Sequence, residues 1–259
     1  MPATAGRAAP PSSVRQVSEP RPGSPGAPLW DPEAVPAATV VVLRDTREGP
    51  EVLMLRRDAG LSFAGGMWVF PGGRIDPEDR HPADGDDPEP AARRAAVREA
   101  REEAGIVVEE PALRRWSHWT PPPRQDKRFT TAFYVAPARD ASARVVIDDG
   151  EIRDHRWVRP ARAIELRDAG EVSLAPPTYI TLVQLLPHRS AAEVLDAAPG
   201  VGAVEHFATR VAITSDGSGW AALYHGDVSY EDDEPDPDRP GPRHRLLMGD
   251  RWEYVRDAP

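Results

Sequence analysis

Three glutamates on one predicted helix are the residues best placed to do chemistry. Glu99, Glu102 and Glu103 stand at positions i, i+3 and i+4 of residues 88–105, a segment rich in Ala, Arg and Glu that ends at Gly105. A helix turns by about 100° per residue, so this spacing puts the three carboxylates in one sector. Their mutual repulsion does not stabilise a helix, whereas a hard divalent cation binds oxygen ligands and leaves positions for water and phosphate. The alternative interpretation is a solvated face of a charged helix.

A glycine pair just upstream could bring the main chain to the same place. Gly72 and Gly73 follow Phe70-Pro71 at the end of an apolar segment that is predicted to be a strand. Without side chains, their backbone could approach both a bound metal and the helix.

These residues resemble the Nudix box, which consists of a glycine, a spacer, a glutamate, a second spacer and the pattern R-E-U-x-E-E-x-G-U, where U is apolar. Residues 98–106 (REAREEAGI) fill every fixed position of the second half, with Ala100 and Ile106 in the apolar slots. Gly73 takes the place of the first glycine. The resemblance covers roughly residues 37–198.

The first half of the box departs from the family pattern. Asp79 follows Gly73 after five intervening residues, where the family usually has glutamate. An acidic insertion, roughly residues 80–90, then lengthens the loop before the helix. Asp79, Glu78 or Glu89 could each take the role of the missing glutamate.

The resemblance implies an enzyme that hydrolyses a diphosphate linkage in a nucleoside diphosphate derivative with the help of Mg²⁺ or Mn²⁺. By this resemblance the metal is held by the carbonyl of Gly73 and by Glu99, Glu102 and Glu103. Arg98 is expected to hold a helix carboxylate in position. The proton acceptor is expected to be Glu99 or an acid on a later loop, for which Glu151 is the best candidate. The catalytic residues expected are therefore Arg98, Glu99 and Glu151.

Features outside the box resemble the branch of the family that includes acyl-coenzyme A diphosphatases. They are the enlarged loop after residues 70–76 (FPGGRID) and the segments at residues 116–121 (WSHWTP) and 127–133 (KRFTTAF). Coenzyme A or acyl-coenzyme A is thus the favoured substrate. An ADP-ribose, dinucleotide or nucleotide-sugar pyrophosphatase is the alternative within enzymes, and a non-catalytic ligand sensor is the alternative outside them.

Four further residues are candidates for substrate binding. Arg56, Arg57 and Arg128 could hold phosphates, or could be solvent-facing residues of strands. Trp119 could offer its ring to an adenine, or could pack in the core.

Strands and helices alternate along the sequence in the way typical of α/β proteins. The strands expected lie at residues 38–44, 51–55, 66–70, 106–108, 128–135 and 151–158, and the helices at 88–105, 160–168 and 177–186. The fold class predicted is a Nudix-type α/β/α sandwich with a mixed sheet. Short strands at residues 211–214, 220–224 and 252–255 predict a β-rich C-terminal extension over 199–259, packed on the domain and able to support a homodimer.

Composition limits the other classes of function. The 259 residues carry a formal net charge of −10 and no cysteine, which argues against a nucleic-acid binder and excludes disulfides and thiolate metal sites. Many of the 30 prolines fall in residues 1–36, which are predicted to be a disordered tail ahead of a domain at 37–198. The sequence shows neither a membrane span nor a secretory signal, so a cytoplasmic protein acting on small molecules is expected.

Overall fold

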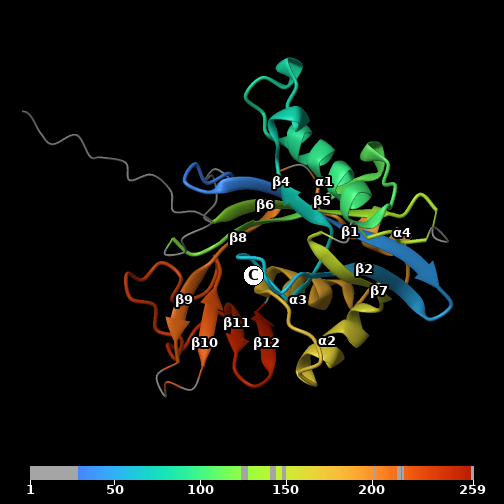
Figure 1. Cartoon of the computed structure of the whole chain (residues 1–259). Coiled ribbons are helices and arrows are strands. Elements are labelled where there is room, and N and C mark those ends of the chain that lie inside the picture. Colours follow the sequence, from blue (N-terminus) through green and yellow to red (C-terminus); the bar gives the residue numbers. More distant parts are fainter. Residues whose placement is uncertain are drawn as a thin grey trace, which may run out of the picture.

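A mixed sheet of eight strands forms the middle layer of the molecule (Figure 1). The computed structural model describes residues 29–123, 128–140, 144–147, 150–200, 202–214, 217 and 219–257. Six strands follow the order β3-β2-β1-β6-β5-β8, while β4 pairs with β1 and β7 with β2. The pairs β1–β6 and β5–β8 are parallel, and the other pairs are antiparallel. The strands are β1 (Val35–Thr46), β2 (Gly49–Arg57), β3 (Trp68–Val69), β4 (Gly72–Arg74), β5 (Arg114–Thr120), β6 (Phe129–Pro137), β7 (Ile152–Val158) and β8 (Glu205–Ala208).

Helix α1 (Glu89–Ala104) covers one face of this sheet through its alanines. Ala92, Ala95, Ala96 and Ala100 are fully buried in a cluster with sheet residues such as Leu53. Such small side chains let the helix axis lie close to the strands, and the abundance of alanine also favours the helix itself. The helix ends at Gly105, which adopts the left-handed conformation (φ 65°) and donates its N–H to the carbonyl of Arg101 at 2.9 Å.

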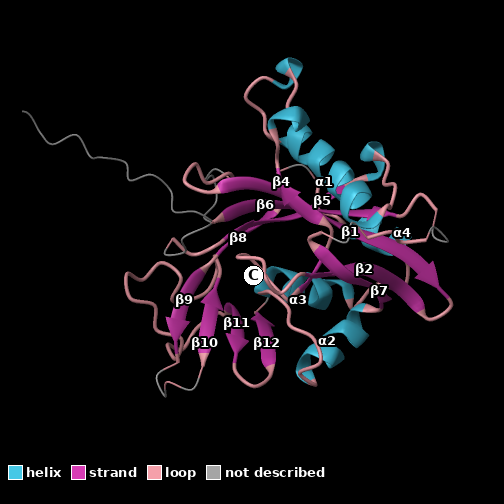
Figure 2. Ribbon diagram, viewed as in Figure 1, coloured by secondary structure: helices cyan, strands magenta, loops and turns pink. Residues whose placement is uncertain are grey.

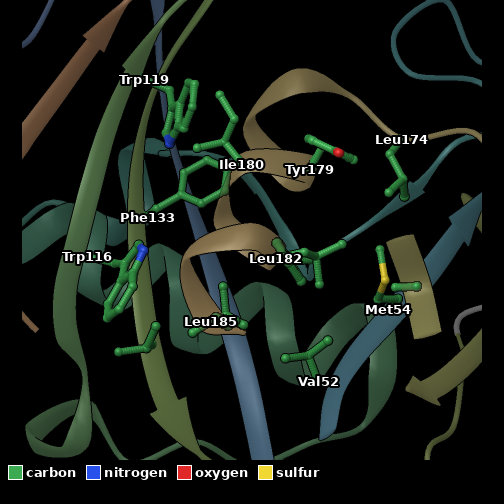
Figure 3. Close-up of a cluster of buried hydrophobic side chains, with 14 of the residues drawn as sticks. Val52, Met54, Trp116, Trp119, Phe133, Leu174, Tyr179, Ile180, Leu182 and Leu185 are labelled. Carbon is green, nitrogen blue, oxygen red and sulfur yellow. The ribbon is translucent and has the colours of Figure 1, made fainter. Parts of the chain in front are cut away.

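Three helices and a second sheet cover the opposite face (Figure 2). Helices α2 (Pro160–Asp168) and α3 (Pro176–Leu185) both carry proline in their first turn, where its missing N–H costs no hydrogen bond. Figure 3 shows Ile180, Leu182 and Leu185 of α3 in one apolar cluster with side chains of the main sheet. Helix α4 (Ala191–Ala197), which the sequence analysis does not predict, packs its buried Ala191 and Val194 in the same cluster.

The C-terminal segment adds one strand to the main sheet and then forms a sheet of its own. The four strands of the second sheet are ordered β12-β11-β10-β9. Their bounds are β9 (Arg210–Ile213), β10 (Trp220–Leu223), β11 (His244–Met248) and β12 (Trp252–Arg256). Strand β8 pairs with β5, and its Phe207 stacks on Trp119 with ring centroids 4.1 Å apart. The predicted boundary at residue 198 between domain and extension stays a prediction, but the structure gives the two parts a shared apolar core.

The predicted fold class is confirmed, and the differences are local. Strand β1 begins at Val35, and the carboxylate of Asp31 accepts a hydrogen bond from Arg128, so part of the predicted tail belongs to the fold. Residues 1–28 of that tail lie outside the described residues. The strand predicted at 106–108 is an extended connection without ladder partners. No helix in the described ranges has the length and apolar character needed to traverse a bilayer.

Candidate active site

The three helix glutamates lie on the wall of one cleft of about 680 Å³, which we call the acidic cleft. Helix α1, strand β4 and the segment just before β7 all contribute to its wall. Its charged lining residues are Arg57, Arg74, Asp76, Arg98, Glu99, Glu102, Glu103 and Glu151. The three helix glutamates and the two upstream glycines, for which the sequence predicts a common site, thus line the same cleft.

Glycines 72 and 73 allow β4 to lie directly against the glutamates of α1. Both residues pair with β1, and the N–H of Gly72 donates to Glu103 Oε2 at 3.0 Å. A Cβ atom on Gly73 would lie 2.3 Å from Glu99 Oε1, and one on Gly72 would lie 2.5 Å from the carbonyl oxygen of Ala38. No residue with a side chain fits at either position without displacing a neighbour.

Arg98 holds two of the helix glutamates in place. Its Nη1 donates to Glu99 Oε1 and to Glu102 Oε2, both at 2.9 Å. Its Nε and Nη2 donate to the two carboxylate oxygens of Asp79, at 3.1 and 2.8 Å. The hydrogen bonds that Arg98 donates to Asp79 are the main cause that raises the pKa of the Arg98 guanidinium, followed by the neighbouring glutamates. A planar guanidinium with several donors suits this role, which a lysine ammonium does not fill.

Asp79 lies behind Arg98 rather than in the acidic cleft. It ends the short 3₁₀ turn Pro77–Asp79, is buried, and also accepts the N–H of Asp76 at 2.9 Å. Glu78 is exposed, while Glu89 bonds Arg115 and Tyr134 at the other end of α1. Asp79 is therefore the one of these three whose carboxylate contacts the arginine of the box.

Burial makes the carboxylates of this cleft unusual. It raises the pKa of Glu103 to about 8, and it also raises the pKa of Glu99, where Arg98 partly opposes the effect. The guanidinium of Arg57 lies near Glu103, with its Nη1 3.8 Å from Glu103 Oε1. The charge of Arg57 therefore opposes the effect of burial on the pKa of Glu103 without cancelling it.

Arg57 and Glu151 meet across the β2–β7 pairing. Arg57 is opposite Ile152 in the register, so Glu151 comes to lie beside it, and Arg57 Nη2 donates to Glu151 Oε2 at 2.9 Å. The Nε of Arg57 is buried and has no hydrogen-bond partner within the described part of the chain. Arg57 thus points a donor-rich group at the floor of the cleft, between Glu103 and Glu151.

The residues present fit a divalent cation. The side-chain atoms of α1 in the cleft that can bind a metal are carboxylate oxygens, the ligands of hard cations, and the buried Glu103 has the Arg57 guanidinium 3.8 Å away. Within the described residues, no three acidic or imidazole side chains lie close enough together to bind one metal ion as they stand. Arg98 and the Gly72 N–H instead engage the glutamates.

Three of the predicted substrate-binding residues lie outside the acidic cleft. Arg56 is exposed and lines a separate surface cavity with Trp68. Arg128 is half-buried against Asp31, to which it donates at 2.6 Å. Trp119 stacks on Phe207, and its edge borders a neighbouring cavity.

Sequence reasoning missed that neighbouring cavity, which has a volume of about 360 Å³ and which we call the apolar chamber. Every second residue in the first part of β6 points to the same face of the sheet. Three of these residues line the chamber: Phe129, Thr131 and Phe133. This period of two is visible in the sequence and could have indicated the face. The lining residues that the C-terminal sheet contributes could not be predicted in this way, because only the fold brings that sheet next to β6.

A helix that carries three glutamates, two glycines packed against them and an arginine that binds two of them are the features of a Nudix box. The comparisons with known proteins agree. The NUDIX domain family model matches residues 34–177, more than half of the 259-residue chain, and the chain belongs to this family.

Two relatives illustrate the match. Acyl-coenzyme A diphosphatase NUDT19 of Gallus gallus is 28% identical over 211 residues, which cover 69% of this chain and 50% of the relative. The chain thus spans about half the length of that protein. The crystal structure of a NUDIX hydrolase from Alicyclobacillus acidocaldarius superposes with a TM-score of 0.57 at 24% identity, covering 64% of this chain and 96% of the other. It bears on the fold alone.

Proposed function

We propose that this chain is a metal-dependent hydrolase that cleaves the diphosphate linkage of coenzyme A or acyl-coenzyme A. One observation carries the proposal: Glu99, Glu102 and Glu103 share the wall of a single cleft with the Gly72-Gly73 backbone. The chemistry named by the Gallus gallus relative supports the choice of substrate.

The residues of the cleft would divide the work as follows. Glu99, Glu102, Glu103 and the Gly73 carbonyl would hold Mg²⁺ or Mn²⁺, which when bound neutralises diphosphate charge and acts as a Lewis acid. Arg98 would keep Glu99 and Glu102 in position. Arg57, which lines the cleft, would donate to a phosphate oxygen.

The proton of the attacking water would pass to a carboxylate of the cleft. Glu99 and Glu151 are the candidates, since both line the cleft. Glu151 already accepts from Arg57, so the same guanidinium could orient the base and the phosphate.

A panel of diphosphates tests this function directly. The purified chain would be incubated with coenzyme A, acetyl-coenzyme A, ADP-ribose, a diadenosine polyphosphate and UDP-glucose, each with Mg²⁺ or Mn²⁺, and the products identified by mass. We expect coenzyme A to yield adenosine bisphosphate and phosphopantetheine, faster than the other compounds are cleaved. Preferred cleavage of ADP-ribose, a dinucleotide or a nucleotide sugar would replace the proposed substrate. Ligand binding with no cleavage would indicate the sensor.

The proposal also covers the location, the partners and the oligomeric state of the protein. We propose a cytoplasmic enzyme for small molecules, with no nucleic-acid or membrane partner, in keeping with its net charge of −10. A homodimer stays a prediction, which sedimentation of the purified chain would test.

A further inference from the structure

The apolar chamber adjoins the acidic cleft. Six residues line both cavities: Thr39, Arg57, Phe63, Gly72, Phe129 and Thr131. A diphosphate bound beside the glutamates would therefore have one of its two substituents at the entrance to the chamber.

The chamber offers little to a polar substituent. Among the described residues that line it, Arg57 is the one charged side chain, and it belongs equally to the acidic cleft. The hydroxyl of Thr120 is already bonded to His206 at 2.9 Å. Aromatic, aliphatic and proline side chains form most of the remaining lining, including Phe63, Phe129 and Phe133. The other polar side chains of the lining are the hydroxyls of Thr39, Thr131, Thr178 and Thr209, so a sugar or a nucleobase placed here would replace few of its hydrogen bonds to water.

The far wall of the chamber comes from the C-terminal segment. Thr209, Val211, Ala222 and Met248 line it, and the last three belong to strands β9, β10 and β11. Figure 1 shows this second sheet on the side of the main sheet opposite α1, next to α3. Strand β8 leads into this second sheet. Its Phe207 stacks on Trp119 of β5, and Trp119 itself lines the chamber.

We infer that the apolar chamber binds the arm that coenzyme A carries on its diphosphate, beginning with the dimethyl-bearing carbon of that arm, and that the C-terminal sheet limits how much of the arm and its acyl group enters. The inference rests on the proposed function and assigns a part of the substrate to a part of the site. In coenzyme A the second carbon after the diphosphate bears two methyl groups, whereas ADP-ribose has a hydroxyl-rich sugar at this place. A contiguous apolar cavity distinguishes these two substituents.

Val211→Trp tests the inference, and Ile213→Trp is its matched control. Both residues lie on β9 two positions apart and are exposed, at 38% and 57%, but only Val211 lines the chamber. The measurements are kcat/KM for coenzyme A and for a series of acyl-coenzyme A esters, and the inhibition constant of ADP, which lacks the arm. Thermal unfolding of both variants checks that the fold is kept.

The expected result separates the arm from the nucleotide. Val211→Trp should lower kcat/KM for the coenzyme A substrates about tenfold or more, increasingly so for longer acyl groups, and leave ADP inhibition unchanged. Ile213→Trp should change none of these values. Unchanged kcat/KM in Val211→Trp would overturn the inference, and so would weakened ADP inhibition, which would put the nucleotide in the chamber. If the wild-type chain cleaves no coenzyme A substrate, the proposed function fails, and the inference fails with it.

Discussion

Adding a single carbon atom at either glycine of β4 would disturb the acidic cleft or its surroundings. A methyl group on Gly73 meets the carboxylate of Glu99, a flexible side chain that can move away. A methyl group on Gly72 meets the backbone of Ala38 and Thr39, which cannot. The same change at adjacent positions should therefore damage function in one case and folding in the other.

We expect Gly73→Ala to keep a near wild-type melting temperature and to lose about 10–100-fold in metal-dependent turnover, because Glu99 is displaced. Gly72→Ala should lower the free energy of unfolding by about 1–3 kcal/mol. Gly200→Ala, where the added Cβ meets nothing within 4 Å, is the control for both. Equal effects of the two substitutions on stability would contradict this account.

Arg98 should matter for geometry rather than for charge. Arg98→Lys keeps the charge but cannot donate at once to Asp79, Glu99 and Glu102, so the Mg²⁺ concentration for half-maximal turnover should rise about 10–100-fold. Titration of activity with Mg²⁺ measures this. Arg101→Lys, an exposed change on the same helix, should have no such effect. Wild-type metal dependence in Arg98→Lys would rule out the positioning role.

At the scale of elements, the sequence predicted what is local and missed what depends on pairing. The helix of the box could be recognised because Glu99, Glu102 and Glu103 follow a 3.6-residue period and Gly105 ends it. The contact of Arg57 with Glu151 depends on the β2–β7 register, and that of Arg98 with Asp79 depends on how the insertion folds. Neither follows from a residue pattern. Arg128 looked available for phosphate only because its partner Asp31 lay in a segment predicted to be a tail.

The pairing of β5 with β8 brings the buried His118 and the half-buried His206 together, and this should make the protein sensitive to acid. Burial, with Arg115 nearby and Asp31 in opposition, lowers the pKa of His206 from 6.5 to about 4. Burial also lowers the pKa of its neighbour His118. Between these pH values the unfolded chain binds protons that the folded chain does not, so stability falls as the pH drops from 6.5 towards 4.

Urea unfolding at several pH values across this range measures the effect. His206→Gln removes one of the two titrations, so its free energy of unfolding should decline less steeply with falling pH than that of the wild type. His155→Gln, an exposed change on β7, should follow the wild-type curve. A wild-type slope in His206→Gln would show that the burial of this ring does not set the acid limit.

At the scale of the whole molecule, the second sheet is part of the fold and of the proposed site. Phe207 is fully buried between Trp119 of the main sheet and Tyr224, which directly follows β10 of the second sheet. Phe207→Ala should therefore lower the free energy of unfolding by about 3–5 kcal/mol, in a single transition. Ile213→Ala, on the exposed face of β9, should cost far less. A separate early transition of the C-terminal segment would instead make it an independent unit.

The central claim is that the three glutamates of α1 hold a metal that supports cleavage of a diphosphate. The measurement that tests it most directly is Mg²⁺-dependent turnover of coenzyme A by Glu103→Gln beside Glu109→Gln. Glutamine at 103 can still accept the Gly72 N–H, so the fold should persist while turnover falls at least about 100-fold. Glu109 pairs with Arg139 outside the cleft, so Glu109→Gln should match the wild type. Wild-type turnover by a folded Glu103→Gln variant would contradict the account.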